Sequence, residues 1–226
     1  MADQTPEITW LDERTPVSKQ YGDPYYSVQD GLAEARHVFL DGNDLPARFR
    51  PDFHIAELGF GTGLNLLATL QCFRKSACSG YLYFTSFEAA PLSAKTMLRA
   101  LSGFAELKPL ATELLDHWPP QCGHVELSDL KFNLVSGDAR VSLKTYDKPA
   151  DAWFLDGFSP AKNPELWGAD ILAQDAHLTN PSGTFATYTA AGHVRRGLTD
   201  AGFDVTRRPG FGRKRHMTTG QLGSAK

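Results

Sequence analysis

Three glycines at alternate positions, Gly59, Gly61 and Gly63, restrict the fold of this chain more than any other feature. A short apolar run precedes them at residues 53–58, and apolar residues with helical spacing follow at residues 64–70. The segment therefore predicts a strand, a tight turn and the start of a helix. Glycine tolerates positive φ and lets a ligand approach bare backbone, where the first N–H groups of a helix are free to bind it. We expect a nucleotide-like cofactor at this turn.

The spacing of the glycines separates two classes of ligand. Dinucleotide-binding turns follow the order G-x-G-x-x-G and place a pyrophosphate at the helix N-terminus. Here Glu57 precedes the glycines in the order E-x-G-x-G-x-G, and a carboxylate suits an ammonium and a sulfonium better than phosphates. This order resembles the first motif of class I methyltransferases, which bind S-adenosyl-L-methionine; a turn that only connects strand to helix is the alternative. The cofactor-binding residues predicted from this stretch are Glu57, Gly59, Phe60, Gly61, Thr62, Gly63 and Asn65.

The composition is that of an ordinary globular protein. Of 226 residues, enough for one α/β domain with a full core, 42% are hydrophobic, and the formal net charge is −3. No apolar run reaches the ~18 residues that a membrane span needs. The cysteines, Cys72, Cys78 and Cys122, form no C-x-x-C pair, so neither a zinc site nor a disulfide framework is predicted. We expect a cytoplasmic protein with no metal and no membrane association.

Acidic residues at the ends of two later strands extend the predicted cofactor site. The aromatic-rich run at residues 81–88 ends in Glu88, where an acid would meet the ribose hydroxyls of a nucleoside. Residues 132–135 lead to Asp138 and Ala139, which suit a contact to an adenine amino group. Surface Gly-Asp turns are common, so a plain turn is the alternative for this second pair.

The segment that follows residues 152–155 is the most informative after the glycines. Four apolar residues in a row are typical of a central parallel strand buried on both faces, and such sheets bind ligands at the carboxyl ends of their strands. The next loop combines prolines, a lysine, an asparagine and large aromatics, unlike a simple solvent-exposed connection. We predict cofactor contacts from Asp156, Gly157 and Phe158, and substrate contacts from Ser159, Pro160, Lys162 and Asn163.

Alternating strands and helices predict a doubly wound α/β sheet with an antiparallel edge. Helices are expected from residue 31 to the stop at residues 41–43, and at residues 64–74 and 166–178. Extended segments at residues 203–208 and 216–219 would form a terminal hairpin.

The first 50 residues are expected to form an N-terminal extension packed on a single globular unit, residues 51–226. Within this extension three tyrosines, Tyr21, Tyr25 and Tyr26, surround one aspartate. They predict either a small packing cluster or an aromatic platform beside the cofactor cleft.

Positive charge gathers toward the end of the chain. From Arg195 onward there are eight lysines and arginines against Asp200 and Asp204, a local formal balance of +6 in a chain of −3. Such an asymmetry suits a phosphate backbone, and an edge hairpin with solvated basic side chains is the alternative.

Four motifs together resemble the methyltransferase domain of the MnmC family, which completes 5-methylaminomethyl-2-thiouridine in bacterial tRNA. They are ELGFGTGLN at residues 57–65, DAWFLDGFSPAKNP at 151–164, TAAGHVRRGL at 189–198 and FGRKR at 211–215. The resemblance implies a Rossmann-like class I methyltransferase fold that uses S-adenosyl-L-methionine, with tRNA as the substrate.

The implied reaction transfers a methyl group to the primary amine of 5-aminomethyl-2-thiouridine at the tRNA wobble position. Because an alkylammonium has a pKa of about 10, its proton must be removed before the nitrogen can attack. Asp156 is the catalytic candidate, since a carboxylate could orient the amine and accept that proton. Tyr25, Tyr26, Arg213, Lys214 and Arg215 complete the predicted substrate-binding residues.

In that family the domain is often fused to a flavin-dependent oxidase. No second glycine fingerprint follows here, so the chain is expected to be the methylating half, with a separate FAD-dependent oxidase as a candidate partner. Two alternatives stay open: a small-molecule N- or O-methyltransferase, which would not need the basic segment, and a non-catalytic protein that binds S-adenosyl-L-methionine or RNA. The sequence does not predict the oligomeric state.

Overall fold

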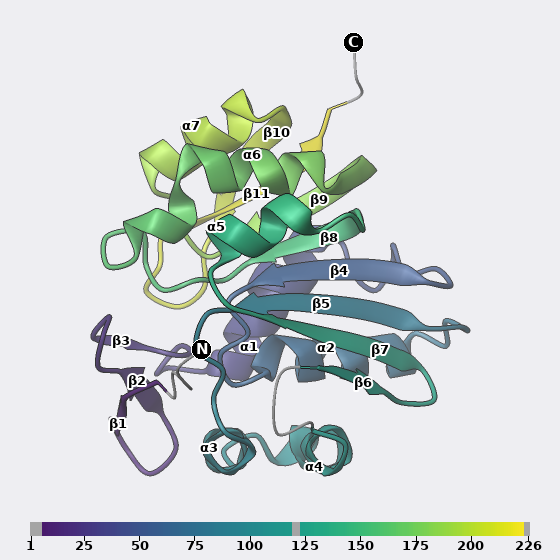
Figure 1. The fold of residues 1–226 in the computed structure, drawn as a ribbon, viewed down its shortest axis with the longest axis vertical. Coiled ribbons are helices and arrows are strands. Elements are labelled where there is room, and N and C mark those ends of the chain that lie inside the picture. The colour runs from purple at the N-terminus through teal and green to yellow at the C-terminus, as the bar shows by residue number, and fades with distance from the viewer. Residues whose placement is uncertain (1–5, 119–122, 224–226) are drawn as a thin grey trace.

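An eight-stranded sheet with helices on both faces organises the chain in a computed structural model that describes residues 6–118 and 123–223 (Figure 1). Its central strands pair in parallel in the order β9, β8, β4, β5 and β7, which are Thr179–Thr187, Ala150–Leu155, Phe53–Leu58, Leu82–Glu88 and Leu130–Ser136. Every residue of β8 is buried, as expected for a strand covered on both faces. Cys122 and Lys226 lie outside the described residues.

Antiparallel strands close both edges of this sheet. β6 (His124–Glu126) pairs with β7 at one edge, and β11 (His216–Leu222) pairs with β9 at the other. β10 (Phe203–Pro209) then pairs with β11 over its whole length. The expected doubly wound sheet with an antiparallel hairpin at its edge is confirmed.

Two apolar clusters lie on the two faces of the sheet. Because successive strand residues point to opposite faces, Ile55 of β4 packs in one cluster and Ala56 and Leu58 pack in the other. The first cluster lies under α1 (Gly31–Ala35), α2 (Leu64–Lys75), α3 (Ala94–Leu101) and α4 (Lys108–Asp116). The second lies under α5 (Ala139–Ser142), α6 (Ala169–His177) and α7 (Gly192–Asp200).

Residues near the N-terminus form a small separate sheet before they join the core. Its strands, β1 (Ile8–Trp10), β2 (Pro16–Ser18) and β3 (Asp23–Pro24), are antiparallel and lie to one side of the main sheet in Figure 1. After α1 the chain continues as a π-helical turn, Arg36–Leu40, and a 3-10 turn, Asp41–Asn43. Leu32, Val38 and Phe39 belong to the first apolar cluster, so this segment shares its core with α2.

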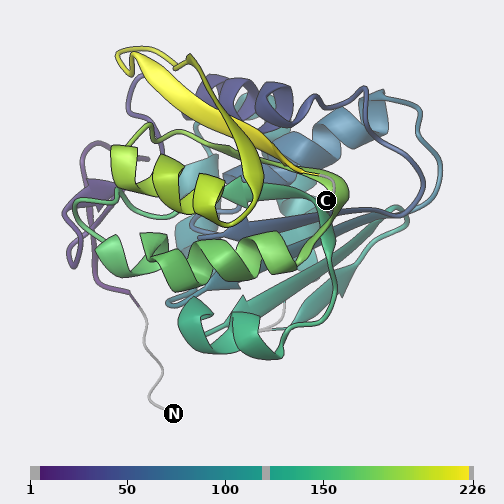
Figure 2. The ribbon, with the colours of Figure 1, turned by 90° about the horizontal axis from the view of Figure 1, so that it is seen from above.

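The C-terminal hairpin packs against this same N-terminal segment (Figure 2). Arg208 Nη1 donates to the carbonyl of Asp41 at 3.2 Å, and His37 Nε2 lies 3.0 Å from the carbonyl of Pro209. Two parts of the chain that are distant in sequence therefore lie side by side.

The expected helix at residues 166–178 begins later than predicted. Leu166 and Trp167 belong to a 3-10 turn, Pro164–Trp167, and α6 begins at Ala169. Gly168 separates the two because its backbone is extended, with φ −70° and ψ 154°. The indole of buried Trp167 instead donates to the carbonyl of Phe158 at 2.9 Å, which fixes the loop after β8.

Among the described residues, no helix combines the length and the apolar character that spanning a bilayer would require.

Candidate active site

A cavity of about 680 Å³ lies at the carboxyl ends of the central strands. Its wall combines the turn after β4, the end of β5, the turn after β7, the loop after β8 and the N-terminal segment. This is the edge where open α/β sheets bind ligands, and the volume falls within the range of about 300–1,000 Å³ usual for small-molecule sites.

Gly59 joins the turn after β4 to the loop after β8. Its φ is +88°, and a Cβ atom added to it would lie 2.3 Å from the carbonyl oxygen of Asp156. Only glycine permits both the backbone conformation and this close approach. Gly61 has φ +54° and faces the ring of Tyr25, which a Cβ atom would approach to 3.2 Å.

Glu57 lies behind the glycine turn and does not line the cavity. It is 0% exposed, accepts hydrogen bonds from Ser86 Oγ at 2.7 Å and Asn65 Nδ2 at 2.9 Å, and so fixes the Asn65 side chain. Burial raises the pKa of Glu57 well above its ordinary value, and these two hydrogen bonds offset that effect only in part. Gly63, another predicted cofactor contact, also lies outside the cavity wall, next to the ring of Phe60.

Asp156 faces the cavity from the end of β8. Its Oδ2 accepts a hydrogen bond of 2.6 Å from Asn65 Nδ2, while Oδ1 receives none from the part of the chain that the structure describes. Desolvation raises the pKa of Asp156 to about 7; the hydrogen bond from Asn65 opposes this shift, the charge of Glu34 adds to it, and Lys214 opposes it. This carboxyl group can therefore gain or lose a proton near neutral pH.

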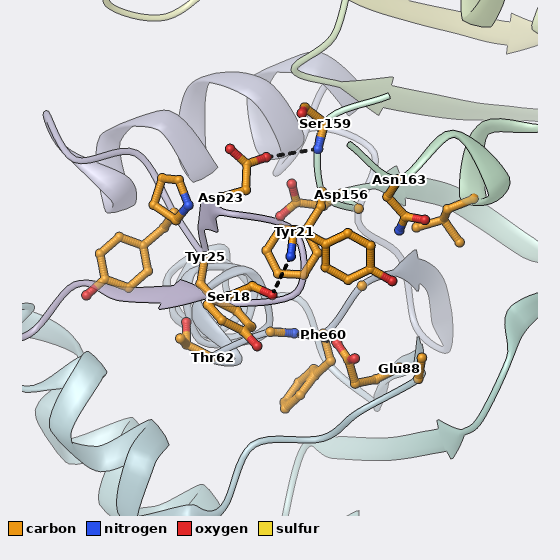
Figure 3. Close-up of a pocket in the computed structure, with 18 of the residues that line it drawn as sticks. Ser18, Tyr21, Asp23, Tyr25, Phe60, Thr62, Glu88, Asp156, Ser159 and Asn163 are labelled. Atoms are coloured by element: carbon orange, nitrogen blue, oxygen red, sulfur yellow. Dashed lines mark hydrogen bonds between the residues drawn. The ribbon is translucent and has the colours of Figure 1, made fainter. Parts of the chain in front are cut away.

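Glu88 lies across the cavity from Asp156 (Figure 3). Its Oε2 accepts the backbone N–H of Gly61 at 3.1 Å and its Oε1 that of Ala90 at 2.9 Å. The carboxylate is thus held at the edge of the glycine turn, at the end of β5.

Asp138 and Ala139 line the cavity beside Glu88. Asp138 caps α5 and forms an ion pair of 2.6 Å with Arg140, whose hydrogen bonds keep the pKa of Asp138 below its ordinary value. Arg140 also lines the cavity, although it was not among the site residues predicted from the sequence.

The N-terminal segment covers the loop after β8. Tyr21 stacks on Phe158 with ring centroids 4.7 Å apart, and Tyr25 meets the same ring edge-on at 5.1 Å. Asp23 Oδ2 accepts the backbone N–H of Ser159 at 3.0 Å (Figure 3), and Asp23 Oδ1 pairs with Lys162 Nζ at 2.8 Å. Aromatic stacking and a charged contact together fix this wall of the cavity.

The predicted substrate-binding residues divide into two groups. Those that line the cavity are Tyr25, Tyr26, Ser159, Asn163 and Lys214. Those that do not line it are Pro160, Lys162, Arg213 and Arg215. Lys162 is directed to Asp23 and to the carbonyl of Gly22, and Arg213 and Arg215 are exposed beside the cavity-lining Lys214.

Glu34 and Tyr188 also line the cavity and were not predicted from the sequence. Glu34 Oε1 pairs with Lys214 Nζ at 2.9 Å, and the hydroxyl of Tyr188 donates to the carbonyl of Gly157 at 2.7 Å. An acid inside the apolar helical pattern of residues 32–39 was the only available signal for Glu34. Within the described ranges, no group of three or more His, Cys, Asp or Glu side chains is placed to hold a metal ion.

Comparison with known proteins shows which proteins this chain is similar to. The model of the S-adenosyl-L-methionine-dependent methyltransferase family Methyltransf_30 matches residues 105–223, more than half of the chain. The chain is 44% identical to the tRNA 5-methylaminomethyl-2-thiouridine biosynthesis bifunctional protein MnmC of Chromohalobacter salexigens and 46% identical to the protein of the same name from Caulobacter sp. strain K31. These alignments cover 96% and 95% of this chain but 33% and 38% of the relatives, so the chain spans about a third of their length.

A solved structure agrees with this comparison. The crystal structure of MnmC2 from Aquifex aeolicus superposes with a TM-score of 0.80 at 28% identity, covering 99% of this chain and 72% of that one. The Rossmann-like fold and the resemblance to MnmC methyltransferase domains, both expected from the sequence motifs, are confirmed.

Proposed function

The chain belongs to the S-adenosyl-L-methionine-dependent methyltransferases, and we propose that it methylates the primary amine of 5-aminomethyl-2-thiouridine at the wobble position of tRNA. The observation that carries this proposal is the similarity, over more than nine-tenths of the chain, to proteins named for 5-methylaminomethyl-2-thiouridine biosynthesis. The half-buried Asp156 at the carboxyl end of β8 supplies a group suited to an amine acceptor.

The glycine turn and Glu88 are suited to hold the cofactor. Gly59 and Gly61 leave bare backbone on the cavity wall, and Glu88 presents a carboxylate that could accept hydrogen bonds from ribose hydroxyls. Asp138 and Ala139 would lie at the adenine, next to the start of α5. When bound, S-adenosyl-L-methionine supplies a methyl group on a sulfonium. Glu57 and Gly63 would support the cofactor site without lining the cavity. Glu57 would hold the side chain of Asn65 in place by accepting its hydrogen bond, and Gly63 would leave room for the ring of Phe60.

Asp156 would orient the amine and take part in the removal of its proton. A free alkylammonium with a pKa of about 10 is almost fully protonated at neutral pH. Oδ1 of Asp156 is available for a hydrogen bond from the amine, and a carboxyl group with a pKa of about 7 can exchange a proton near neutral pH. The rings of Tyr21, Tyr25 and Phe158 pack together at this wall. Shielding of the amine from water by these rings would favour its neutral form.

The C-terminal hairpin and α7 would contact the tRNA backbone. Arg36, Arg74 and Arg140 elsewhere form ion pairs. The six arginines of α7 and the hairpin form none with any other described residue; they are Arg195, Arg196, Arg207, Arg208, Arg213 and Arg215. Loss of hydration and then the charges of Arg207 and Arg215 lower the pKa of His216, so positive charge is concentrated there. Uncompensated arginines of this kind bind phosphates.

Residues 51–226 would act as one methylating unit, with residues 1–50 as an extension that covers its cavity. We also propose a cytoplasmic location, where tRNA is available. The relatives are named bifunctional, and a separate FAD-dependent oxidase would be the partner that prepares the amine.

Transfer of labelled methyl to hypomodified tRNA tests the proposal. The purified protein is incubated with methyl-labelled S-adenosyl-L-methionine and tRNA that carries 5-aminomethyl-2-thiouridine, and the tRNA is digested and its nucleosides are identified. One methyl group should appear on the wobble nucleoside, while fully modified tRNA should gain none. Equal activity on the free nucleoside would indicate a small-molecule methyltransferase, and cofactor binding without any transfer would indicate a non-catalytic protein.

A further inference from the structure

An ion pair between opposite ends of the chain lies in the wall of the cavity. Glu34, on α1, is only 9% exposed, and its Oε1 is 2.9 Å from Nζ of Lys214 in the loop between β10 and β11. The same Nζ lies 4.1 Å from the ring centroid of Tyr188, a cation–π contact. Both charged residues line the cavity.

This pair is connected to Asp156 through Tyr188. The Tyr188 hydroxyl donates to the carbonyl of Gly157, the residue directly after Asp156, at 2.7 Å. Burial and then the charge of Asp156 raise the pKa of Tyr188, so the phenol remains a neutral hydrogen-bond donor.

The titratable and charged groups around Asp156 come from several elements. Glu34 belongs to α1 and Lys214 to the hairpin loop, and Tyr188 follows β9. Asn65 of α2 donates to Asp156 directly, and Glu57 of β4 lies behind that amide. Of these groups, Glu34 and Lys214 are the two that carry opposite charges and line the cavity together with Asp156.

We propose that Glu34 and Lys214 are positioning residues that set the charge of Asp156 and thereby determine how the cavity receives an acceptor amine. The inference rests on the proposed function, because it concerns the acceptor end of the same site. Burial is the main cause that brings the pKa of Asp156 to about 7. Glu34 disfavours a second negative charge at Asp156 and Lys214 favours it, so the pair adjusts the protonation of a carboxyl group that burial already brings near neutral pH. A carboxyl group balanced in this way can accept a proton from the amine and release it to water afterwards.

Two variants that break the same ion pair should shift the titration midpoint of Asp156 in opposite directions. Asp156 is titrated by carbon-13 NMR of labelled aspartate carboxyl groups, with its signal assigned by its loss in Asp156→Asn. Glu34→Gln removes a negative neighbour and should lower the midpoint by about half a pH unit or more, because charges that line the same cavity interact more strongly than they would across bulk water. Lys214→Met removes a positive neighbour and should raise the midpoint by a similar amount, whereas Lys214→Arg should leave it close to the parent value.

Matched controls separate this effect from loss of an ion pair in general. Lys131 pairs with Glu126 at 3.8 Å on strands β7 and β6, outside the cavity wall, and Lys131→Met should leave the Asp156 titration unchanged. Shifts of the same sign in Glu34→Gln and Lys214→Met, or no shift in Lys214→Met, would overturn the inference. If Glu34→Gln does not fold, the Asp156 midpoints of Lys214→Met and Lys214→Arg still test the inference. Lys214 is partly exposed, so we expect both of its variants to fold.

A kinetic measurement adds a second readout. The midpoint of the acidic limb of methyl transfer to tRNA should move down in Glu34→Gln and up in Lys214→Met. The NMR titration uses no methyl donor and no tRNA, so it tests the ion pair even if the parent protein transfers no methyl group. Absence of transfer by the parent protein would contradict the proposed function alone.

Discussion

The side-chain amide of Asn65, in the first turn of α2, donates a hydrogen bond of 2.6 Å to Asp156 at the end of β8. The same nitrogen donates to buried Glu57 at 2.9 Å. One amide therefore joins the helix of the glycine turn to the loop that carries the candidate catalytic carboxyl. The position of Asp156 depends on the strand, turn and helix that also form the candidate cofactor site.

Replacement of Asn65 by alanine should destabilise the protein and raise the pKa of Asp156. Both carboxyl groups lose a donor in a site removed from water, which costs about 1–3 kcal/mol of unfolding free energy. The hydrogen bond from Asn65 favours ionised Asp156, so its loss favours the protonated form. Urea unfolding and the carbon-13 titration of Asp156 measure the two effects. An unchanged Asp156 midpoint would show that Asn65 does not govern this carboxyl group.

Replacement of Glu88 by alanine should weaken cofactor binding. If the carboxylate accepts hydrogen bonds from ribose hydroxyls, its loss should cost about 1.5–3 kcal/mol, or roughly a ten- to hundredfold increase in Kd. Calorimetric titration with S-adenosylhomocysteine measures the affinity. Glu126→Ala, at the edge strand β6 away from the cavity, is the control. Equal affinities for the two variants would place the ribose elsewhere.

The sequence predicted the parts of this site whose signals are local. The strand before Gly59, the positive φ of the glycine turn and the buried strand before Asp156 each follow from a few adjacent residues. The late start of α6 was missed because extended Gly168 and the anchored indole of Trp167 override an otherwise helical pattern.

Contacts between distant segments could not be predicted in the same way. Glu34 and Lys214 are 180 residues apart, and Asp23 and Ser159 are 136 apart. Each pair exists only because a terminal segment packs against the edge of the finished sheet, and no periodicity or turn signal specifies such packing. Helical spacing placed Glu34 in a helix but could not indicate which charge it would meet.

Asp175 should make the stability of the protein depend on pH. This α6 side chain is 0% exposed, and neither carboxyl oxygen has a hydrogen-bond partner among the described residues. Burial raises the pKa of Asp175 well above its ordinary value, so the folded protein holds a proton that the unfolded chain releases above a pH of about 4. Unfolding free energy is therefore lost as pH rises from that point toward the folded-state pKa, by up to about 1.4 kcal/mol per pH unit.

Asp175→Asn tests this dependence because asparagine has the same size and does not ionise. The unfolding free energy of the variant, relative to that of the parent protein, should increase progressively from pH 5 to pH 8. This range lies above the pKa of about 3.9 that an aspartate has in the unfolded chain. Urea unfolding at several pH values gives the difference, and Asp170→Asn, exposed on the same helix, serves as the control. A constant difference across this range would mean that folded Asp175 does not retain its proton.

Arg213 and Arg215 should contribute to tRNA binding without any part in cofactor binding. Both are exposed, neither lines the cavity, and neither forms an ion pair with another described residue, so their charges are available to phosphates. The double variant Arg213→Ala/Arg215→Ala keeps Lys214 and its pair with Glu34, and it should bind tRNA more weakly with a flatter salt dependence. Each lost phosphate contact lowers the steepness of the plot of log binding constant against log salt concentration by about 0.9 for a duplex or about 0.7 for a single strand.

The charge-matched control is Lys144→Ala/Lys148→Ala, which alters two exposed lysines shortly before the start of β8 and should keep the parent slope. A lower melting temperature with an unaltered slope in the arginine variant would mean that these residues support the hairpin, and the tRNA contacts would then have to come from α7 or the N-terminal segment.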